Sequence, residues 1–213
     1  MKKAILSAAA LTAASLAAPA PAQANVSIAS AYEAGRCIVD RDRSAAVALI
    51  RSLPLDSSPA NLSSLGSRAA GCVSGPMSAL LLRGAIAQEL FLRDFRSFGR
   101  EPRNPDRLVN LNLPVEEFGS RGSGATELYR WSDCVVRNDT VNTERLLRSP
   151  VGSAEEAGAL EALQTYMSAC FTQGAQLSVR SSEVRSLFAQ SAYYSMYRYW
   201  TGQLQSARGR DGA

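Results

Sequence analysis

The sequence carries the same pattern of residues twice, and this repetition is the feature that most constrains the fold. Tyr32 and Cys37 return 97 positions later as Tyr129 and Cys134. Further pairs at a spacing of 97 or 98 positions are Val39/Val136, Asp42/Asp139, Arg51/Arg148, Ser52/Ser149, Leu62/Leu160, Leu65/Leu163, Cys72/Cys170, Leu80/Leu177, Arg83/Arg180, Leu90/Leu187 and Phe91/Phe188. Self-similarity at a fixed spacing is typical of repeated structural units. We therefore predict an internal duplication of two similar units.

Apolar residues in both units recur at the three- and four-residue spacing of a buried helix face. The clearest stripes are Leu62, Leu65, Ala69 and Cys72 in the first unit, and Leu160, Leu163, Met167 and Cys170 in the second. We expect about four helical segments in each unit, and therefore an all-α fold with little or no sheet. Since a unit of about 60 residues is only marginally stable alone, the apolar faces of the two units are expected to pack together.

The two predicted units are separated and flanked by segments of different composition. The first helical unit spans residues 25–98 and the second spans residues 126–205. Between them, residues 99–125 contain three prolines and four glycines, which oppose a long helix and predict a connection. Residues 206–213 are dominated by arginine, glycine and aspartate, and we expect a disordered tail.

Residues 1–24 have the composition of a secretory signal peptide. Lys2 and Lys3 are followed by an alanine-rich apolar run, and Ala22-Gln23-Ala24 supplies the small residues that a signal peptidase recognises. We expect cleavage after Ala24 and a periplasmic or secreted mature protein. No later segment is long and apolar enough to predict a membrane span.

Removal of the signal also removes both lysines of the chain. The mature protein would keep 21 arginines against 19 acidic residues, a net charge of +2. This small excess is spread along the chain and does not form the concentrated basic patch that phosphate-backbone binding needs. Nucleic acid is therefore not an expected partner.

The four cysteines stand at duplicated positions and predict two disulfides, because exported chains commonly carry paired cysteines. Four cysteines allow three connectivities. Only Cys37–Cys72 with Cys134–Cys170 treats the two units alike and closes loops of nearly equal length. Turns near residues 54–57 and 151–152 would bring the members of each pair level on antiparallel arms. We predict one disulfide in each unit.

The chain contains no histidine. This excludes Ser-His-Asp and Cys-His nucleophilic sites, histidine general bases and nearly all catalytic zinc sites. Carboxylate chemistry needs no histidine, since glycosidases cleave with paired acidic residues. Glu116 and Glu117 in the connection are candidates for such a site, although adjacent glutamates are more often solvated. We expect no catalytic residue, metal ion or cofactor.

Two charged pairs kept in both units are candidate binding residues: Asp42 with Asp139, and Arg83 with Arg180. A binding site present in each unit would explain them. We favour a repeated structural role, in which the aspartates cap helices. Each arginine would then contact protein groups, such as a helix end or the aspartate of its unit.

Aromatic residues crowd into the segment 181–200, and Tyr197 and Trp200 are further binding candidates there. The full set is Phe188, Tyr193, Tyr194, Tyr197, Tyr199 and Trp200. A groove for carbohydrate or peptide is one interpretation, because aromatic rings with polar tips suit such contacts. A helix that closes the core is the interpretation we favour. Exposure of Tyr199 and Trp200 would favour the groove.

The segment CVVRNDTVNTERLLRSPVGSAEEAGALEAL, which closes at Cys170, and the later QLSVRSSEVRSLF resemble uncharacterised secreted helical proteins of sphingomonad-type bacteria. The resemblance covers both units and is strongest in the second. It implies an exported helical protein and brings no activity with it.

A duplicated scaffold without a catalytic constellation favours a non-catalytic binding or interaction module of the cell envelope. Its expected partner is an envelope protein, a wall component or a second copy of the chain. Two alternatives are a carboxylate-dependent cell-wall hydrolase and a small-ligand carrier with a pocket between the units. A closed cavity lined by both units would favour the carrier.

Overall fold

The computed structural model describes residues 28–52, 60, 62, 67–100, 102–103, 123–171 and 179–211. In this part of the chain all regular structure is helical, and the one β pairing is an isolated bridge between Phe95 and Pro102. The predicted all-α fold is confirmed. The helices, in chain order, are α1 (Ile28–Arg41), α2 (Arg43–Ser52), α3 (Ser67–Ala70), α4 (Ala79–Asp94), α6 (Ser123–Asn138), α7 (Thr140–Arg148), α8 (Ala154–Ala169) and α9 (Ser181–Asp211).

Several element boundaries differ from the sequence prediction. The first unit was expected to stay helical to about residue 98, but α4 ends at Asp94, because Phe95 is extended and the chain turns back to the bridge with Pro102. Helix α6 begins at Ser123, inside the expected connection, and α9 continues through residues 206–211 of the expected tail. The predicted signal peptide and most of the connection lie outside the described residues.

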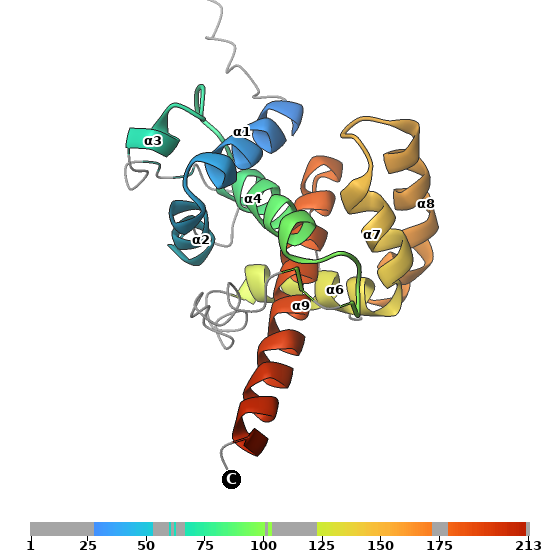
Figure 1. The fold of residues 1–213 in the computed structure, drawn as a ribbon. Helices are drawn as coiled ribbons and strands as arrows, with labels where there is room; N and C mark the ends of the chain where they lie inside the picture. The colour runs from blue at the N-terminus through green and yellow to red at the C-terminus, as the bar shows by residue number, and fades with distance from the viewer. Residues whose placement is uncertain are drawn as a thin grey trace, which may run out of the picture.

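The crossing of α4 and α9 forms the centre of the molecule (Figure 1). Helix α1 packs on α4, and α2 and α3 contact α1. On the other side α6 and α7 pack on α9, and α8 contacts both α6 and α7. Each half therefore contributes one central helix, α4 or α9, and the two halves meet where these helices cross. The C-terminal end of α9 extends beyond the other helices (Figure 1).

Helix α4 and residues 185–194 of α9 are buried on nearly all sides, because other helices cover opposite faces of each. All residues from 185 to 194 on α9 are buried, and α4 buries most of its length. A helix surrounded in this way does not need the one-sided apolar stripe of a surface helix. This explains why polar residues such as Gln88 on α4 and Gln190 on α9 lie inside the protein.

Two glycines allow the helix axes to come close together. A Cβ atom on Gly84 would lie 2.4 Å from the Cα of Ser186 on α9, and a Cβ on Gly35 would lie 2.7 Å from the carbonyl carbon of Ala85. Neither position has room for a methyl group. Gly84 therefore sets the approach of the two halves, and Gly35 sets the approach of α1 to α4.

Gly84→Ala is expected to destabilise the protein by roughly 2 to 3 kcal/mol, because the added methyl group forces two packed backbones apart. Gly158→Ala on α8 is the matched control. Its new methyl would meet only the guanidinium of Arg145 at 3.6 Å, and the higher helix propensity of alanine should stabilise by up to about 1 kcal/mol. Urea unfolding followed by circular dichroism gives both values. Equal effects of the two substitutions would contradict the close approach at Gly84.

Candidate functional site

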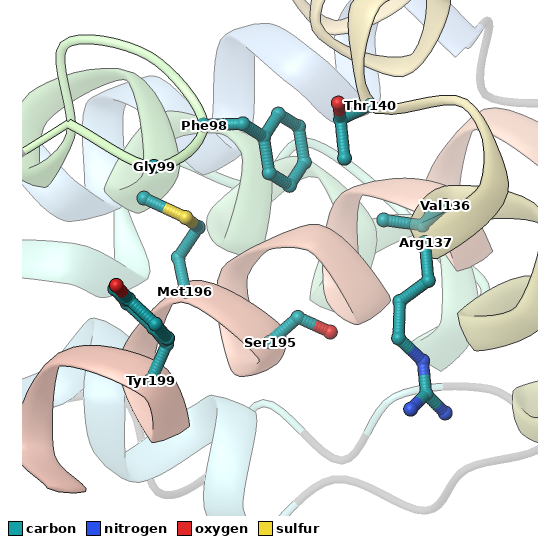
Figure 2. A pocket seen from close by; sticks show the side chains of 8 residues that line it. All are labelled: Phe98, Gly99, Val136, Arg137, Thr140, Ser195, Met196 and Tyr199. Carbon is teal, nitrogen blue, oxygen red and sulfur yellow. The ribbon is translucent and has the colours of Figure 1, made fainter.

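An open groove lies between the centre of α9, the junction of α6 with α7 and the segment that follows α4 (Figure 2). Its volume is about 340 Å³. The lining residues are Phe98, Gly99, Val136, Arg137, Thr140, Ser195, Met196 and Tyr199. The groove therefore draws its walls from segments that are far apart in the sequence, with Phe98 from the first unit and most of the rest from the second.

The lining of the groove is mostly apolar, and its polar side chains Arg137, Thr140 and Ser195 lie around it (Figure 2). Figure 2 shows Phe98, Val136 and Met196 around the hollow, with the guanidinium of Arg137 directed away from the ring of Phe98. Arg137 forms an ion pair with Asp133 one turn earlier on α6. The other carboxylate oxygen of Asp133 accepts a hydrogen bond from Ser195 Oγ at 3.0 Å. This set of side chains suits contact with an apolar group and offers no paired acid and base.

Apolar side chains near the groove are unusually exposed. Tyr199 is 52% exposed at the groove, and Val141, next to the lining residue Thr140, is 76% exposed. The ring of Tyr199 packs edge-on against Trp200, with centroids 5.2 Å apart. Exposed apolar side chains beside an apolar hollow are typical of contact surfaces.

The aromatic binding candidates predicted from the sequence are partly corrected by their burial. Tyr197 is buried, with 4% of its surface exposed, and Tyr193 and Tyr194 are buried beside it. Trp200 is half-buried. Tyr199 is the exposed aromatic residue of this segment, and it lines the groove. The interpretation as a core helix therefore applies to the buried tyrosines, and the interpretation as a groove applies to Tyr199.

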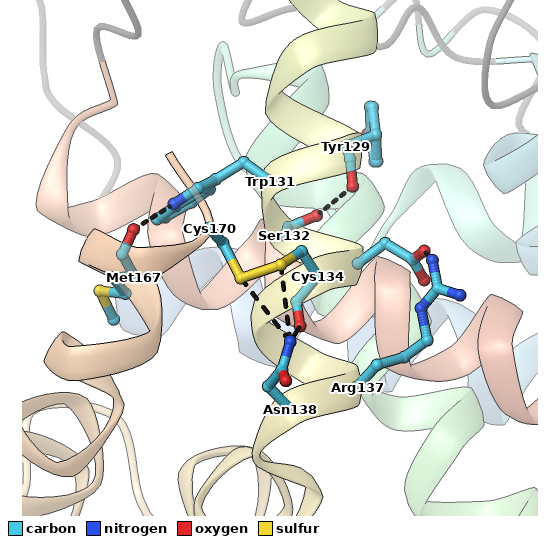
Figure 3. Close-up of a disulfide and its surroundings, with 9 residues drawn as sticks. Tyr129, Trp131, Ser132, Cys134, Arg137, Asn138, Met167 and Cys170 are labelled. Atoms are coloured by element: carbon cyan, nitrogen blue, oxygen red, sulfur yellow. Dashed lines mark hydrogen bonds and ion pairs between the residues drawn. A yellow bond between two sulfur atoms is a disulfide. The ribbon is translucent and has the colours of Figure 1, made fainter. Parts of the chain in front are cut away.

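The four predicted cysteine positions form the predicted disulfides, Cys37–Cys72 and Cys134–Cys170. The second joins α6 to the C-terminal end of α8 (Figure 3). Asn138 Nδ2 lies 3.6 and 3.9 Å from its two sulfur atoms and donates to the carbonyl of Cys134 at 2.9 Å. Closing a loop of this length contributes roughly 4 kcal/mol of stability by restricting the unfolded chain.

Both predicted aspartate caps are confirmed. The backbone N–H of Ala45 donates to Asp42 Oδ1 at 2.9 Å, and that of Asn142 donates to Asp139 Oδ1 at 2.9 Å. Each carboxylate therefore satisfies a free amide at the start of a helix, α2 or α7. Neither aspartate lines the groove, and the structure gives them a structural role.

The two arginines of the predicted pair lie in different environments. Arg83, in the first turns of α4, is buried and donates to the hydroxyl of Tyr194 at 2.9 Å. Arg180 is exposed, which corrects the prediction that it contacts protein groups more than solvent. The reason is the start of α9 at Ser181: Arg180 precedes the helix, whereas Arg83 lies within α4 and faces the core.

Arg185 on α9 is a buried side chain with a structural role that sequence reasoning missed. It is 2% exposed, and its Nε donates to Gln88 Oε1 on α4 at 2.9 Å. Its Nη1 donates to Glu156 Oε1 at 2.9 Å, and its Nη2 donates to the carbonyls of Ser149 at 2.8 Å and Leu147 at 3.3 Å. A signal existed, since position 185 lies one turn before the buried Phe188 and Ala189.

Tyr32 on α1 completes the surroundings of Arg185. The guanidinium carbon of Arg185 lies 5.1 Å from the centre of the Tyr32 ring, a cation–π distance. The Tyr32 hydroxyl is 3.2 Å from Ser186 Oγ. Burial raises the pKa of Tyr32 to about 12. Burial likewise raises the pKa of Tyr129 and of Tyr193, and the nearby Asp94 carboxylate adds to the effect at Tyr193.

The two glutamates at the start of α8 serve structural roles. Glu156 accepts from Arg185 and from the backbone N–H of Gly152, while its own N–H donates to Ser153 Oγ at 3.1 Å. Ser153 therefore caps α8, and Glu156 reaches back to the residue before the cap in the manner of a capping box. Glu155 is exposed, and hydrogen bonds at the helix start lower its pKa. Glu116 and Glu117 lie outside the described residues.

The described part of the chain contains no group of three histidine, cysteine or acidic side chains placed to hold a metal ion. Nor is any helix there both long enough and apolar enough to cross a membrane. Comparison with protein-family models, with curated proteins and with solved structures finds no match to this chain. The functional argument therefore rests on the groove and its surroundings.

Arg185→Met is expected to destabilise the protein by roughly 3 to 5 kcal/mol, because it leaves the partly buried Glu156 carboxylate and the carbonyls of α7 without their cation. Arg180→Met is the matched control, since Arg180 is exposed and a surface change costs about 0.5 kcal/mol or less. Urea unfolding midpoints compare the two variants. Equal midpoints would show that Arg185 does not anchor the helices.

Stability is expected to fall as the pH rises from about 10 to about 12. Above pH 10 the exposed phenol of Tyr32 in the unfolded chain loses its proton, while the folded state holds the proton up to about pH 12. The unfolded state therefore binds fewer protons in this range, and stability decreases with pH. Tyr32→Phe should make this decrease shallower in thermal melts. An unchanged pH dependence in the variant would contradict the burial of a neutral phenol at this position.

Proposed function

We propose that this chain is an exported, non-catalytic binding module of the cell envelope, and that its groove docks an apolar side chain of a partner protein. The observation that carries this proposal is the open apolar groove with the exposed Tyr199 at its edge. Protein contact sites combine exposed aromatic residues with an apolar centre and a polar rim. The groove has each of these parts.

The surroundings of the groove favour binding over catalysis. Asp133 bonds to two of the lining residues, and its carboxylate is held by Arg137 and Ser195. A carboxylate engaged in this way is not free to approach a substrate as a general acid. The hydrolase alternative therefore depends on Glu116 and Glu117, outside the described residues.

The small-ligand carrier receives less support than the binding module. That alternative predicted a closed cavity between the units, and ligand carriers enclose most of the surface of their cargo. The groove at Phe98 and Met196 is lined from both units, but it is open to solvent. An open site of this kind suits a side chain presented by another protein.

The two disulfides are consistent with the export that we propose. Two disulfides are typical of proteins that fold in an oxidising compartment. Together with the predicted signal peptide, they support a periplasmic or secreted protein, which is the location we propose.

Site-specific photocrosslinking tests the proposed docking site. Benzoylphenylalanine at position 199 of the full chain is expected to give a light-dependent adduct with a defined protein in the cell envelope. The matched control places the same group at Glu33, which is exposed on α1 and does not line the groove. Identical adducts at both positions, or none at position 199, would contradict docking in the groove. Release of muropeptides from purified peptidoglycan by the mature protein would favour the hydrolase.

A further inference from the structure

We infer that the partner docked in the groove is a second copy of this chain, which inserts the side chain of Phe171 at the C-terminal end of its α8. This inference rests on the proposed function, because it names the occupant of the same groove. It is carried by two complementary surfaces on one chain: a basic rim around the apolar groove, and an exposed aromatic ring at the negative end of an acidic helix.

The basic rim is formed by arginines beside the groove walls. Arg96 and Arg100 are exposed on either side of the lining residues Phe98 and Gly99. Among the described residues neither of these two side chains forms an ion pair. Arg137 adds a third guanidinium, whose side chain is 70% exposed. The rim therefore presents positive charge that the neighbouring carboxylates leave partly uncompensated.

The carboxylates closest to this rim already have protein partners. Asp133 accepts from Arg137 and Ser195. Glu144 on α7 accepts from Ser97 Oγ at 2.6 Å and pairs with Arg148 at 2.8 Å, and hydrogen bonds from Ser97 and Arg148 lower its pKa despite partial burial. A negatively charged segment that approaches the groove would consequently be attracted by the guanidinium groups of the rim. The carboxylates of Asp133 and Glu144 would repel it less, because they are already paired.

Helix α8 has the complementary charge. Its sixteen residues include three glutamates and no arginine or lysine. Helices α1, α4, α6 and α7 each carry an arginine in the last turn, whereas the last turn of α8 has no basic residue. The C-terminal end of a helix bears a partial negative charge that a cation stabilises. The end of α8 is therefore suited to receive guanidinium groups from another molecule.

Phe171 stands at this end of α8 and is 43% exposed. Its ring packs edge-on against Trp131, with centroids 6.1 Å apart, so one side of the ring is supported while the rest is open to solvent. Among the described residues the other large exposed apolar side chains are Tyr199 and Val141, which lie at or beside the groove. Phe171 is thus the apolar anchor that a second copy can present from outside the groove.

The outer side of α8 leads from a carboxylate to this anchor. Glu161, Gln164 and Ser168 are exposed, and their three- and four-residue spacing places them on one side of the helix. Phe171 follows two residues after the last residue of α8. The helix itself lies at the outer side of the second half (Figure 1). A second copy can therefore reach this side of α8 without moving other helices.

The inferred contact places Phe171 of one copy in the groove of the other, with the rim of Arg96 and Arg100 facing the end of α8 and Glu161. Burial of the aromatic ring supplies the non-directional attraction. The charges fix the orientation and oppose a contact between two basic rims. Each copy carries one groove and one Phe171, and in the inferred two-fold dimer the same contact is made twice.

Sedimentation velocity of the full mature chain with reversed charges tests this inference. The groove variant is Arg96→Glu with Arg100→Glu. The helix variant is Glu161→Arg with Gln164→Arg, two exposed positions. Glu155 stays in place because its carboxylate favours the start of α8. Glu33→Arg on the exposed side of α1 is the control for a change of net charge.

The unchanged chain and the Glu33→Arg control are expected to dimerise, and added salt should weaken the dimer. The groove variant and the helix variant should each be monomeric alone. Mixing them should restore a dimer, because each then meets a surface of opposite charge. Phe171→Ser removes the anchor and should weaken the dimer about tenfold or more. Circular dichroism melts check that the variants are folded.

A monomeric unchanged chain at its highest soluble concentration would overturn the inference, and so would a dimer that survives in both reversed variants. The experiments distinguish a failure of the dimer inference from a failure of the proposed function. If the adduct at position 199 contains a different protein and the chain sediments as a monomer, the groove binds a partner but not a second copy. If the position-199 adduct is absent as well, docking in the groove is itself refuted.

Discussion

The arrangement of the helices depends on the way the buried guanidinium of Arg185 is satisfied. A cation inside a protein is tolerated only where hydrogen bonds and opposite charge replace water. Its partners lie on three other segments: Gln88 on α4, Glu156 at the start of α8, and the carbonyls of Leu147 and Ser149 at the end of α7. Apolar burial draws these helices together without direction, whereas the directional bonds of this one side chain join α7, α8 and α9 to α4.

The features that could be predicted from the sequence are those that depend on local or repeated patterns. The cysteine pairing followed from equal loop lengths, and the cap at Asp139 followed from a short carboxylate before an apolar helix. The groove was not predictable, because Phe98 and Met196 become neighbours only through tertiary packing. Arg185 was missed for a related reason. An arginine among serine and glutamate looks solvated, and only the crossing of α4 and α9 makes its position a buried one.

The predicted duplication has a counterpart in the way the halves meet. Helix α1 packs on α4 as α6 packs on α9, and the central helices of the two halves cross. Under the 97-residue spacing, Gln88 and Arg185 are equivalent positions, and they are hydrogen-bonded to each other. Equivalent positions in mutual contact are what a two-fold arrangement of two copies places on its axis. The duplication itself stays a prediction from the sequence, and this contact is an observation that it would explain.

The positions of the two disulfides also determine how the chain would carry a mechanical load. Each closed loop spans 35 or 36 residues, on the order of 120 Å of fully extended chain that tension cannot release. The loops contain α2, α3, α7 and α8, while α4 and α9 lie outside them. A pull on the two ends therefore passes through the sulfur bridges to the crossing of α4 and α9, and the helices inside the loops are shielded from it.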